Sequence, residues 1–251
     1  MNVEAFCTAC GAQVPDRALS SLVNNAGIMT GKRLNERLVR GGFVDETVWT
    51  NHCGPAALAS RLAATFDVGR VVMVSSRLET RGRADLVVDL DPGGPPPAAA
   101  AYATSKQCNL LFAREFARRR PDVLVTSVTP GMVNTELGRY HPLFRISAPL
   151  RHLLLPTPAQ GAESLVHCAT APAETLARNG YYSRSRGRDD PAIVPIDPSP
   201  AARDDALARA LWEKTDTWTG GALRAGDAST SAAADLCAKV PLAACASGHD
   251  L

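Results

Sequence analysis

Tyr102 and Lys106 are the pair of residues whose types and spacing most directly indicate chemistry. In the stretch YATSK (102–106) they stand four residues apart, so on a helix both side chains lie on one face. A phenol has a pKa of about 10 and is a poor base at neutral pH, but a neighbouring ammonium favours the phenolate and lowers that pKa. Such a pair can exchange a proton with an alcohol or carbonyl oxygen. The same spacing also occurs on ordinary surface helices, and this alternative stays open for the pair taken alone.

Two serines supply a second candidate. Ser75 and Ser76 end the stretch RVVMVSS (70–76), a β-branched apolar run typical of a strand buried on both faces of a parallel sheet. Ligands gather at the carboxyl ends of parallel strands, where a hydroxyl can hydrogen-bond a substrate oxygen. Capping of the following turn is the structural alternative for either serine.

A further candidate loop comes after the apolar run DVLVTSVTPG (122–131). In TPGMVNTEL (129–137), Pro130 and Gly131 predict a tight turn, and Thr135 offers a hydroxyl that could also cap the next element. A plain β-turn is the alternative here. The loop is nevertheless another polar loop at the end of a predicted strand.

Buried strands and helices alternate along the chain. Apolar spacing and helix boundary signals predict helices over 43–66, 102–120, 157–170 and 199–220, the last on the surface. Strand candidates are 18–25, 70–76, 122–131 and 180–183. Thr157 is the expected N-cap of the third helix, with Pro158 at its first position. The alternation predicts an α/β fold with a parallel sheet flanked by helices.

Composition argues against several classes of protein. The chain has 251 residues, of which 45% are hydrophobic and 21% charged, and its net charge is +2. Such a balance gives no drive toward nucleic acid or an acidic membrane surface. No window reaches the roughly 18 to 20 apolar residues of a membrane span, and no signal peptide is visible. Seven scattered cysteines do not resemble a disulfide framework. We therefore expect a cytoplasmic protein that binds a small molecule rather than nucleic acid.

The motifs form an ordered series. NNAG (24–27), a helical Asn51, the Ser-Ser strand end, Tyr-x-x-x-Lys and Pro-Gly-x-x-x-Thr come one after another, each on the element type it needs. This series resembles the short-chain dehydrogenase/reductase family. TSK after the tyrosine, the long insertion before it (77–101) and LLFAREFARR after it are similar to the retinol-dehydrogenase-like branch. The resemblance covers roughly residues 20–220 and implies a Rossmann-like sheet.

The resemblance implies a role for each motif residue. Tyr102 would be the general acid/base, and Lys106 would lower its pKa and hold the nicotinamide ribose. Ser76, the second serine of its pair, would orient the substrate oxygen, and Asn51 would hold a water in the proton relay. The residues expected along an NAD or NADP cofactor are Asn24, Ala26, Gly27, Tyr102, Lys106, Pro130, Gly131 and Thr135. No metal site is expected.

The resemblance also implies a reaction and a substrate class. An alcohol and a carbonyl would be interconverted, and the hydride chemistry would belong to the cofactor. The apolar region 137–156 would form a substrate lid suited to a lipophilic molecule. Helices around Asn51 and Tyr102 commonly form the family's dimer face, so a homodimer is an expectation from the resemblance alone.

The start of the chain departs from the family pattern. The family begins with a strand and a glycine-rich turn, T-G-x-x-x-G-x-G, which holds the cofactor diphosphate at a helix N-terminus. Ahead of NNAG the one glycine is Gly11, and strands one to three have no counterpart. We therefore expect an N-terminally truncated fold: an atypical segment 1–20, a partial family domain 21–220 and a disordered tail 221–251. Strand four would then be an open edge. Cofactor affinity would fall by several kcal/mol, since charge-assisted hydrogen bonds contribute roughly 1.5–3 kcal/mol each.

Alternatives stay open for the first residues and for the whole chain. FCTAC (6–10) resembles one knuckle of a zinc ribbon, but a structural zinc needs four ligands and no second C-x-x-C is found. A redox motif or unrelated sequence is the other interpretation. For the whole chain, one hypothesis is an NAD(P)-dependent oxidoreductase. The other is a catalytically inactive, truncated family member that acts as a binding or dimerisation partner.

Overall fold

A five-stranded sheet forms the centre of the protein. The computed structural model describes residues 3–14, 16–29, 44–89, 98–131, 133, 155–185 and 192–224. The strands of the sheet, in spatial order, are β2 (Leu22–Asn24), β4 (Arg70–Val74), β5 (Leu124–Thr129), β6 (Gly180–Arg184) and β7 (Ile193–Pro195). The first four run parallel, and β7 pairs antiparallel with β6. The predicted parallel α/β sheet is therefore confirmed, and β7 is a strand that the sequence did not reveal.

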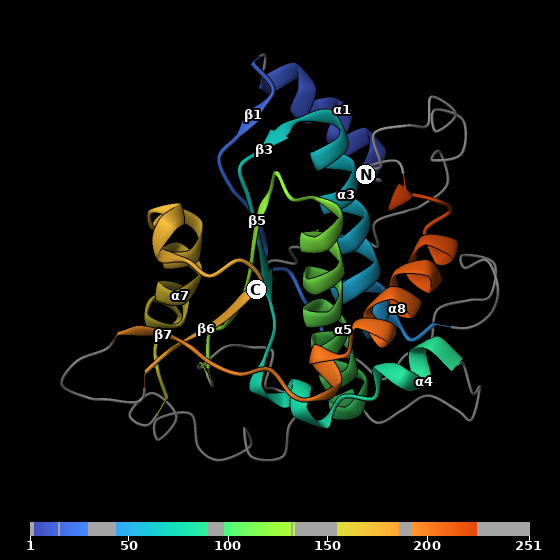
Figure 1. Ribbon diagram of the computed structural model, residues 1–251, viewed down its shortest axis with the longest axis vertical. Coiled ribbons are helices and arrows are strands. Elements are labelled where there is room, and N and C mark those ends of the chain that lie inside the picture. Colours follow the sequence, from blue (N-terminus) through green and yellow to red (C-terminus); the bar gives the residue numbers. More distant parts are fainter. Residues whose placement is uncertain are drawn as a thin grey trace, which may run out of the picture.

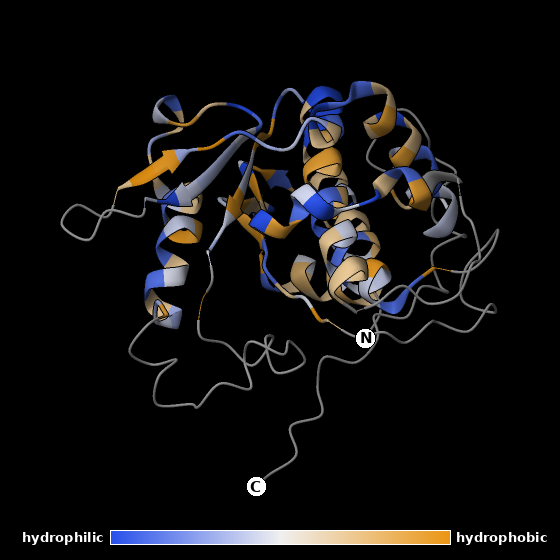
Figure 2. Cartoon of the chain, turned by 90° about the horizontal axis from the view of Figure 1, so that it is seen from below, coloured by the Kyte–Doolittle hydropathy of each residue, from blue (hydrophilic) through white to orange (hydrophobic). Residues whose placement is uncertain are grey.

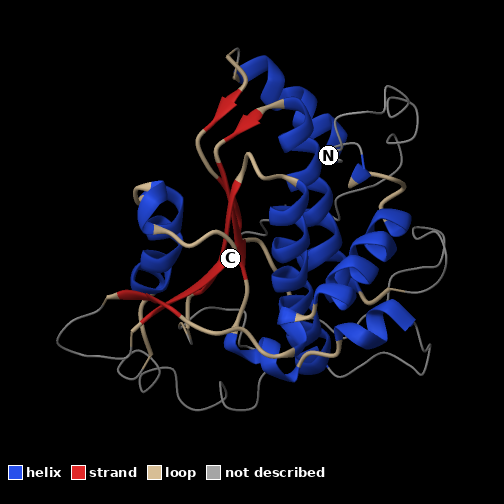
Figure 3. Cartoon of the chain, in the orientation of Figure 1, coloured by secondary structure: helices blue, strands red, loops and turns tan. Residues whose placement is uncertain are grey.

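Helices cover both faces of this sheet (Figure 1). On one face lie α3 (Gly54–Thr65) and α5 (Ala98–Arg119), and on the other lies α7 (Pro158–Thr170). α1 (Val3–Gln13) packs on α3, and α8 (Asp205–Trp218) packs on α5. The two faces are covered unequally: α7 lies on one side of the strands, and a thicker layer of helices that includes α3 and α5 lies on the other (Figure 3). No helix within the described part of the chain is long and apolar enough to cross a membrane.

The central strand β4 is buried on both faces, as its composition predicted. Val71 and Met73 belong to the hydrophobic cluster beneath α3 and α5. Val72 and Val74 belong to the cluster beneath α7. Because successive side chains of a strand point to opposite faces, a continuous apolar run satisfies two helical layers at once.

Shorter segments complete the fold. They are the parallel strand pair β1 (Ala18–Leu19) and β3 (Asp67–Val68), the helices α2 (Glu46–Val48) and α4 (Ala84–Asp89), the π-helical turn Trp49–Cys53, and the 3-10 turns Arg77–Arg81, Ala173–Thr175 and Ala201–Arg203. The single helix expected over 43–66 is thus interrupted by a wider π-helical turn at Asn51. Part of the insertion 77–101 is helical, whereas its DPGGPPP core lies outside the described residues.

The third predicted helix begins as expected. Thr157 is the N-cap of α7, and its hydroxyl accepts a hydrogen bond from the Gln160 backbone N–H. The Gln160 side chain accepts one in return from the Thr157 backbone N–H, which completes a capping box. Pro158 occupies the first turn, where its missing N–H costs nothing.

The last helix lies at the surface, as predicted, with one face buried and the other exposed. α8 carries both hydrophobic and hydrophilic bands, as do the other helices (Figure 2). Its apolar side is buried against α5, where the Trp212 ring stacks on Phe112 with centroids 5.5 Å apart and an interplanar angle of 3°. The Arg119 guanidinium lies 4.6 Å from the Trp212 ring centroid on α8. The charged residues between the apolar positions concealed this burial in the sequence.

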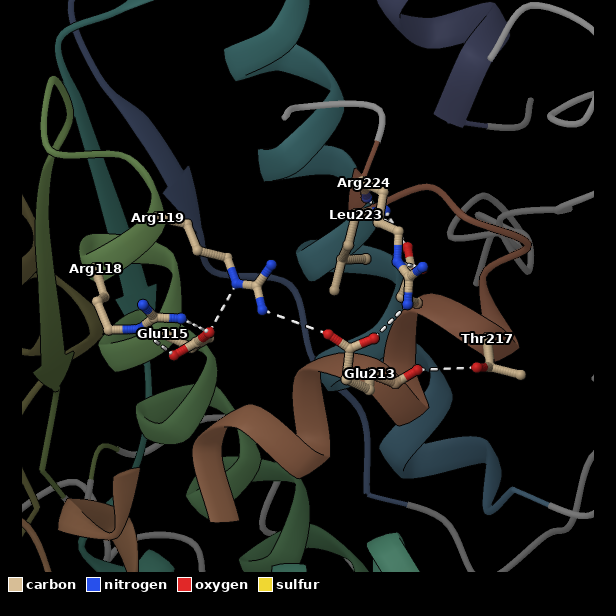
Figure 4. A network of polar contacts seen from close by, with 8 residues as sticks. Glu115, Arg118, Arg119, Glu213, Thr217, Leu223 and Arg224 are labelled. Carbon is tan, nitrogen blue, oxygen red and sulfur yellow. Dashed lines mark hydrogen bonds and ion pairs between the residues drawn. The ribbon is translucent and has the colours of Figure 1, made fainter. Parts of the chain in front are cut away.

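Ion pairs reinforce the contact between α5 and α8 (Figure 4). Glu115 accepts hydrogen bonds from Arg118 and Arg119, and Arg119 also pairs with Glu213 at 3.4 Å. Glu213 in turn pairs with Arg224, beyond the end of α8. Burial by itself would raise the pKa of Glu115, but the two arginines outweigh burial and hold this pKa below its ordinary value.

The segment before NNAG is folded onto the core. α1 places Val3 and Cys7 in the cluster with α3, and Cys10 packs against the same cluster. Within the described ranges, no three His, Cys, Asp or Glu residues form a group that could hold a metal ion. β2 is the edge strand of the described sheet and pairs there with β4 alone. The expected lid lies largely in 134–154 and most of the expected tail in 225–251, both outside the described residues.

We expect Trp212→Ala to weaken the fold markedly. The substitution removes a buried ring that stacks on Phe112 and lies beneath the Arg119 guanidinium. The free energy of unfolding should fall by about 3–5 kcal/mol, as for other large buried aromatic residues. Urea denaturation followed by circular dichroism measures this change. Lys214→Ala, two residues further along α8, serves as the control and should cost less than about 1 kcal/mol. A comparable loss in both variants would contradict a core position for Trp212.

Candidate active site

The two serines at the end of β4 have different surroundings. Ser75 is buried; its N–H donates to the Val128 carbonyl at 2.7 Å and its hydroxyl to the Lys106 carbonyl at 2.8 Å. Ser76 is partly exposed, and its side chain has a polar interaction with Tyr102 that acts to lower the pKa of the phenol. Its Oγ also accepts a bond from the Leu78 N–H, which caps the next turn. Ser75 therefore holds strand and helix together, while Ser76 lies beside the phenol.

Tyr102 and Lys106 are brought together on α5, with Nζ 5.5 Å from the centroid of the tyrosine ring. Burial raises the pKa of Tyr102 to about 12, and the interaction with Ser76 opposes this only in part. Burial also lowers the pKa of Lys106 to about 8. The expected lowering of the phenol pKa by the ammonium is thus not seen. Both groups are desolvated, and Nζ donates to the Val74 carbonyl at 2.9 Å instead of to the phenol.

Asn51 joins the NNAG loop to α5. Its Oδ1 accepts a hydrogen bond from the Ile28 N–H at 2.7 Å, and its Nδ2 donates to the Ile28 carbonyl at 2.8 Å. The same Nδ2 donates to the Ser105 hydroxyl at 3.0 Å, which itself donates to the Tyr102 carbonyl. The π-helical turn aims the asparagine inward; such turns are frequent at functional sites. Ser105 lies inside YATSK, but nothing in the sequence predicted its hydrogen bond with Asn51.

The NNAG loop passes close to the lysine. A Cβ atom at Gly27 would stand 3.3 Å from Asn51 Oδ1 and 3.5 Å from Lys106 Nζ, so any side chain there would fill the space between these groups. Asn24 is buried, and its Nδ2 contacts the Pro55 carbonyl and the Met73 sulfur. Ala26 is exposed beside it. The loop backbone thus approaches the ammonium closely at Gly27, where a residue with a side chain would crowd Asn51 and Lys106.

The loop after β5 lies at the same edge of the sheet. Gly131 has a φ of +80°, a left-handed conformation that favours glycine, and a Cβ there would meet no atom of the described residues within 4 Å. Its N–H donates to the Thr129 hydroxyl at 3.3 Å. Pro130 is half-buried, and Thr135 lies outside the described residues. This arrangement is consistent with a ligand that extends from Lys106 toward β5.

His52, next to Asn51, is a polar core residue to which the sequence assigned no role. It is fully buried, and its Nε2 lies 2.8 Å from the Thr215 hydroxyl on α8. Burial lowers the pKa of His52 to about 4, and a polar interaction with Asn109 opposes this effect only in part. The imidazole is therefore neutral at neutral pH.

The sequence is similar to those of known proteins. Residues 1–142 match the model of the short chain dehydrogenase family, so the match includes the segment 1–20 that we expected to be atypical. DnrU of Streptomyces sp. (strain C5), a candidate daunorubicin C-13 ketoreductase, is 37% identical over 220 residues, which are 85% of this chain and 70% of that protein. Dehydrogenase/reductase SDR family member 13 of Bos taurus is 35% identical over 84% of this chain and 54% of its own length. Human retinol dehydrogenase 11 is 31% identical over 84% of this chain and 64% of its own length. The chain thus spans little more than half the length of several of these relatives.

Solved structures show the same fold. A crystal structure of an uncharacterized protein from Mycobacterium paratuberculosis superposes with a TM-score of 0.62 at 23% identity, over 85% of this chain and 69% of that one. The 3-alpha-hydroxysteroid dehydrogenase of Pseudomonas sp. B-0831, complexed with NADH, superposes with a TM-score of 0.52 at 21% identity, over 72% and 76%.

The chain therefore belongs to the short-chain dehydrogenase/reductase family, and within it to the retinol-dehydrogenase-like branch that its motifs predicted. The family consists of oxidoreductases that act on alcohols and carbonyls of small molecules with a nicotinamide cofactor.

Burial of a neutral His52 should make the fold sensitive to acid. The unfolded chain binds a proton at this residue below about pH 6.5, whereas the folded chain does so only near pH 4. Stability is therefore lost as the pH falls from about 6.5 toward 4, by about 2 kcal/mol at pH 5. Urea unfolding at pH 7.5 and pH 5 measures the loss. His52→Gln should show a smaller difference between the two pH values; equal differences in both proteins would exclude His52 as the source.

Proposed function

We propose that this chain is an NAD(P)-dependent oxidoreductase that interconverts an alcohol and a carbonyl on a small, lipophilic substrate. The observation that supports it best is that the side chains of Ser76 and Tyr102 interact at the carboxyl end of β4, with Lys106 Nζ 5.5 Å from the centroid of the tyrosine ring. Two neighbouring hydroxyls can hold a substrate oxygen and hand it a proton.

The protonation state of Tyr102 favours carbonyl reduction. A phenol with a pKa of about 12 carries its proton at neutral pH, so it is a proton donor rather than a base. In the reductive direction Tyr102 would give this proton to the substrate oxygen, while the Ser76 hydroxyl orients that oxygen. The name of DnrU as a ketoreductase agrees with this direction.

Lys106 and Asn51 would support the proton transfer. An ammonium with a pKa of about 8 is mainly protonated at neutral pH and stabilises negative charge that develops on the phenol oxygen. Asn51, through Ser105, holds the backbone at Tyr102 in place. The water-holding role of Asn51 stays a proposal from the resemblance.

A bound nicotinamide nucleotide would supply or accept the hydride. The residues proposed to line it are Asn24, Ala26, Gly27, Lys106, Pro130, Gly131 and Thr135. Gly27 brings the loop backbone close to Lys106, and Gly131 has no atom of the described residues within 4 Å of its Cβ position, so both would let a cofactor approach the backbone.

The second candidate is a catalytically inactive family member that acts as a binding or dimerisation partner. The observation that favours it is the edge position of β2, whose outer side is unpaired within the described residues. Cofactor binding and turnover separate the two candidates.

Isothermal titration of the purified 251-residue chain with NADH and NADPH tests the proposal, together with turnover of a panel of lipophilic aldehydes and ketones. Tyr102→Phe removes the proton donor but keeps the ring, and should lower kcat by about 10²–10⁴-fold. Tyr182→Phe is the matched control. Tyr182 is also buried, but its hydroxyl bonds the Ala177 N–H, beneath α7. We expect this variant to keep its activity.

Absence of binding at millimolar cofactor would exclude the enzymatic role for this chain and leave the second candidate. Binding together with equal turnover in Tyr102→Phe and the unaltered chain would overturn the assignment of Tyr102 as proton donor.

A further inference from the structure

Asn109 and Lys106 share one hydrogen-bond acceptor. Asn109 lies about one helical turn after Lys106 on α5, and the two side chains are 1% and 3% exposed. Lys106 Nζ donates to the Val74 carbonyl at 2.9 Å, and Asn109 Nδ2 donates to the same oxygen at 3.1 Å. A carbonyl oxygen has two lone pairs, so these two donors together complete its hydrogen bonding.

His52 is a neighbour of Asn109 in this part of the core. A polar interaction with the Asn109 side chain partly offsets the effect of burial on the pKa of His52. Within the described part of the chain, neither Asn109 Oδ1 nor His52 Nδ1 has a hydrogen-bond partner. His52 Nε2 lies 2.8 Å from the Thr215 hydroxyl, and the tautomer of the imidazole decides which of the two groups donates.

The acceptor itself is held by its neighbours. Val74 is the last residue of β4, and the next residue, Ser75, is tied both to β5 and to α5. The Val74 carbonyl therefore cannot turn away without breaking the bonds of Ser75 to Val128 and Lys106. A fixed acceptor gives the ammonium a fixed position.

The surroundings of Lys106 make this acceptor important. Of the described ionisable groups around the ammonium, Tyr102 is protonated and neutral at neutral pH, and His52, behind Asn109, is neutral as well. Burial is the cause of the lowered pKa of Lys106, and no charged neighbour among the described residues contributes to it. A buried ammonium without a carboxylate depends on hydrogen bonds for its orientation. Its remaining protons face Gly27 and the tyrosine.

We infer that Asn109 is a positioning residue for Lys106: its amide holds the Val74 carbonyl and confines the ammonium to the side that faces Gly27 and Tyr102. The inference rests on the proposed function in so far as Lys106 acts in catalysis.

The titration of Lys106 tests the inference without any turnover. Lysines are few in the chain: Lys32, Lys106, Lys214 and Lys239. Labelling lysine with ¹³C lets each ammonium be titrated by NMR, and Lys106→Met identifies the signal that belongs to Lys106. In the unaltered chain this signal should titrate near pH 8, well below the usual value of about 10.4.

Asn109→Leu and Asn109→Asp are the informative variants. Leucine keeps the approximate volume but removes the amide N–H, whose positive end lies beside the ammonium, so the pKa of Lys106 should rise by roughly half a unit or more. Aspartate adds a carboxylate, and the pKa should rise further, by more than about one unit. The aspartate variant keeps the test decisive where the leucine variant does not fold.

Gln107→Met is the matched control. Gln107 is equally buried on α5, but its side chain bonds the Ala84 N–H and the Glu79 carbonyl, away from Lys106. We expect it to leave the pKa of Lys106 within about 0.2 units of its value in the unaltered chain. An unchanged Lys106 pKa in folded Asn109→Leu, or equal shifts in the Asn109→Leu and Gln107→Met proteins, overturns the positioning role.

The outcome is independent of the proposed function. A shifted lysine titration in a chain that fails to bind NADH or NADPH keeps the positioning role and excludes the enzyme. Cofactor binding together with an unchanged Lys106 pKa in the Asn109 variants excludes the positioning role and keeps the proposed enzyme. In an active chain, Asn109→Leu should lower kcat several-fold more than Gln107→Met does.

Discussion

The junction between the end of β4 and the middle of α5 is the contact on which the rest of the site depends. The Val74 carbonyl accepts from Lys106, and the Ser75 hydroxyl donates back to the Lys106 carbonyl. These reciprocal bonds fix both the height and the rotation of the helix against the strand. Ser76 and Tyr102 then meet because each lies close to a residue of this junction in its own element.

This junction is stable because apolar packing surrounds it. Desolvating an ammonium, an asparagine and a histidine is costly unless each finds partners. The partners here are the Val74 carbonyl for Lys106 and Asn109, and the Thr215 hydroxyl for His52. α3 and α8 close the region from outside, and the stack of Trp212 on Phe112 anchors α8 to the helix that carries the tyrosine. The same burial sets the unusual pKa values of Tyr102 and Lys106.

The candidate site residues come from two parts of the fold that differ in packing. The residues proposed to handle the proton all stand at the end of β4, on α5 and in the turn before α3, where packing is dense. The NNAG loop, in contrast, extends from β2, the edge strand of the described sheet. The residues proposed for proton transfer therefore lie in the densely packed part of the fold, while Asn24, Ala26 and Gly27, which are proposed to contact the cofactor, lie in or next to the edge strand of the described sheet.

The sequence by itself determined the elements and the chemical types at their ends. The apolar run of β4 requires burial on both faces, the cap of α7 is a consequence of Thr157 and Pro158, and Tyr102 and Lys106 share a face because they are four residues apart on a helix. These features depend on neighbours along the chain, so periodicity and capping rules can predict them.

Only the tertiary structure decided which groups meet. The π-helical turn at Asn51, the burial of α8 and the convergence of Asn109, His52 and Thr215 arise from residues far apart in sequence. The pKa of Tyr102 is the clearest example: spacing alone predicted a lowered value, but the fold desolvates the phenol and directs the ammonium to a carbonyl. Desolvation and hydrogen-bond choice are properties of a packed environment, and no local pattern encodes them.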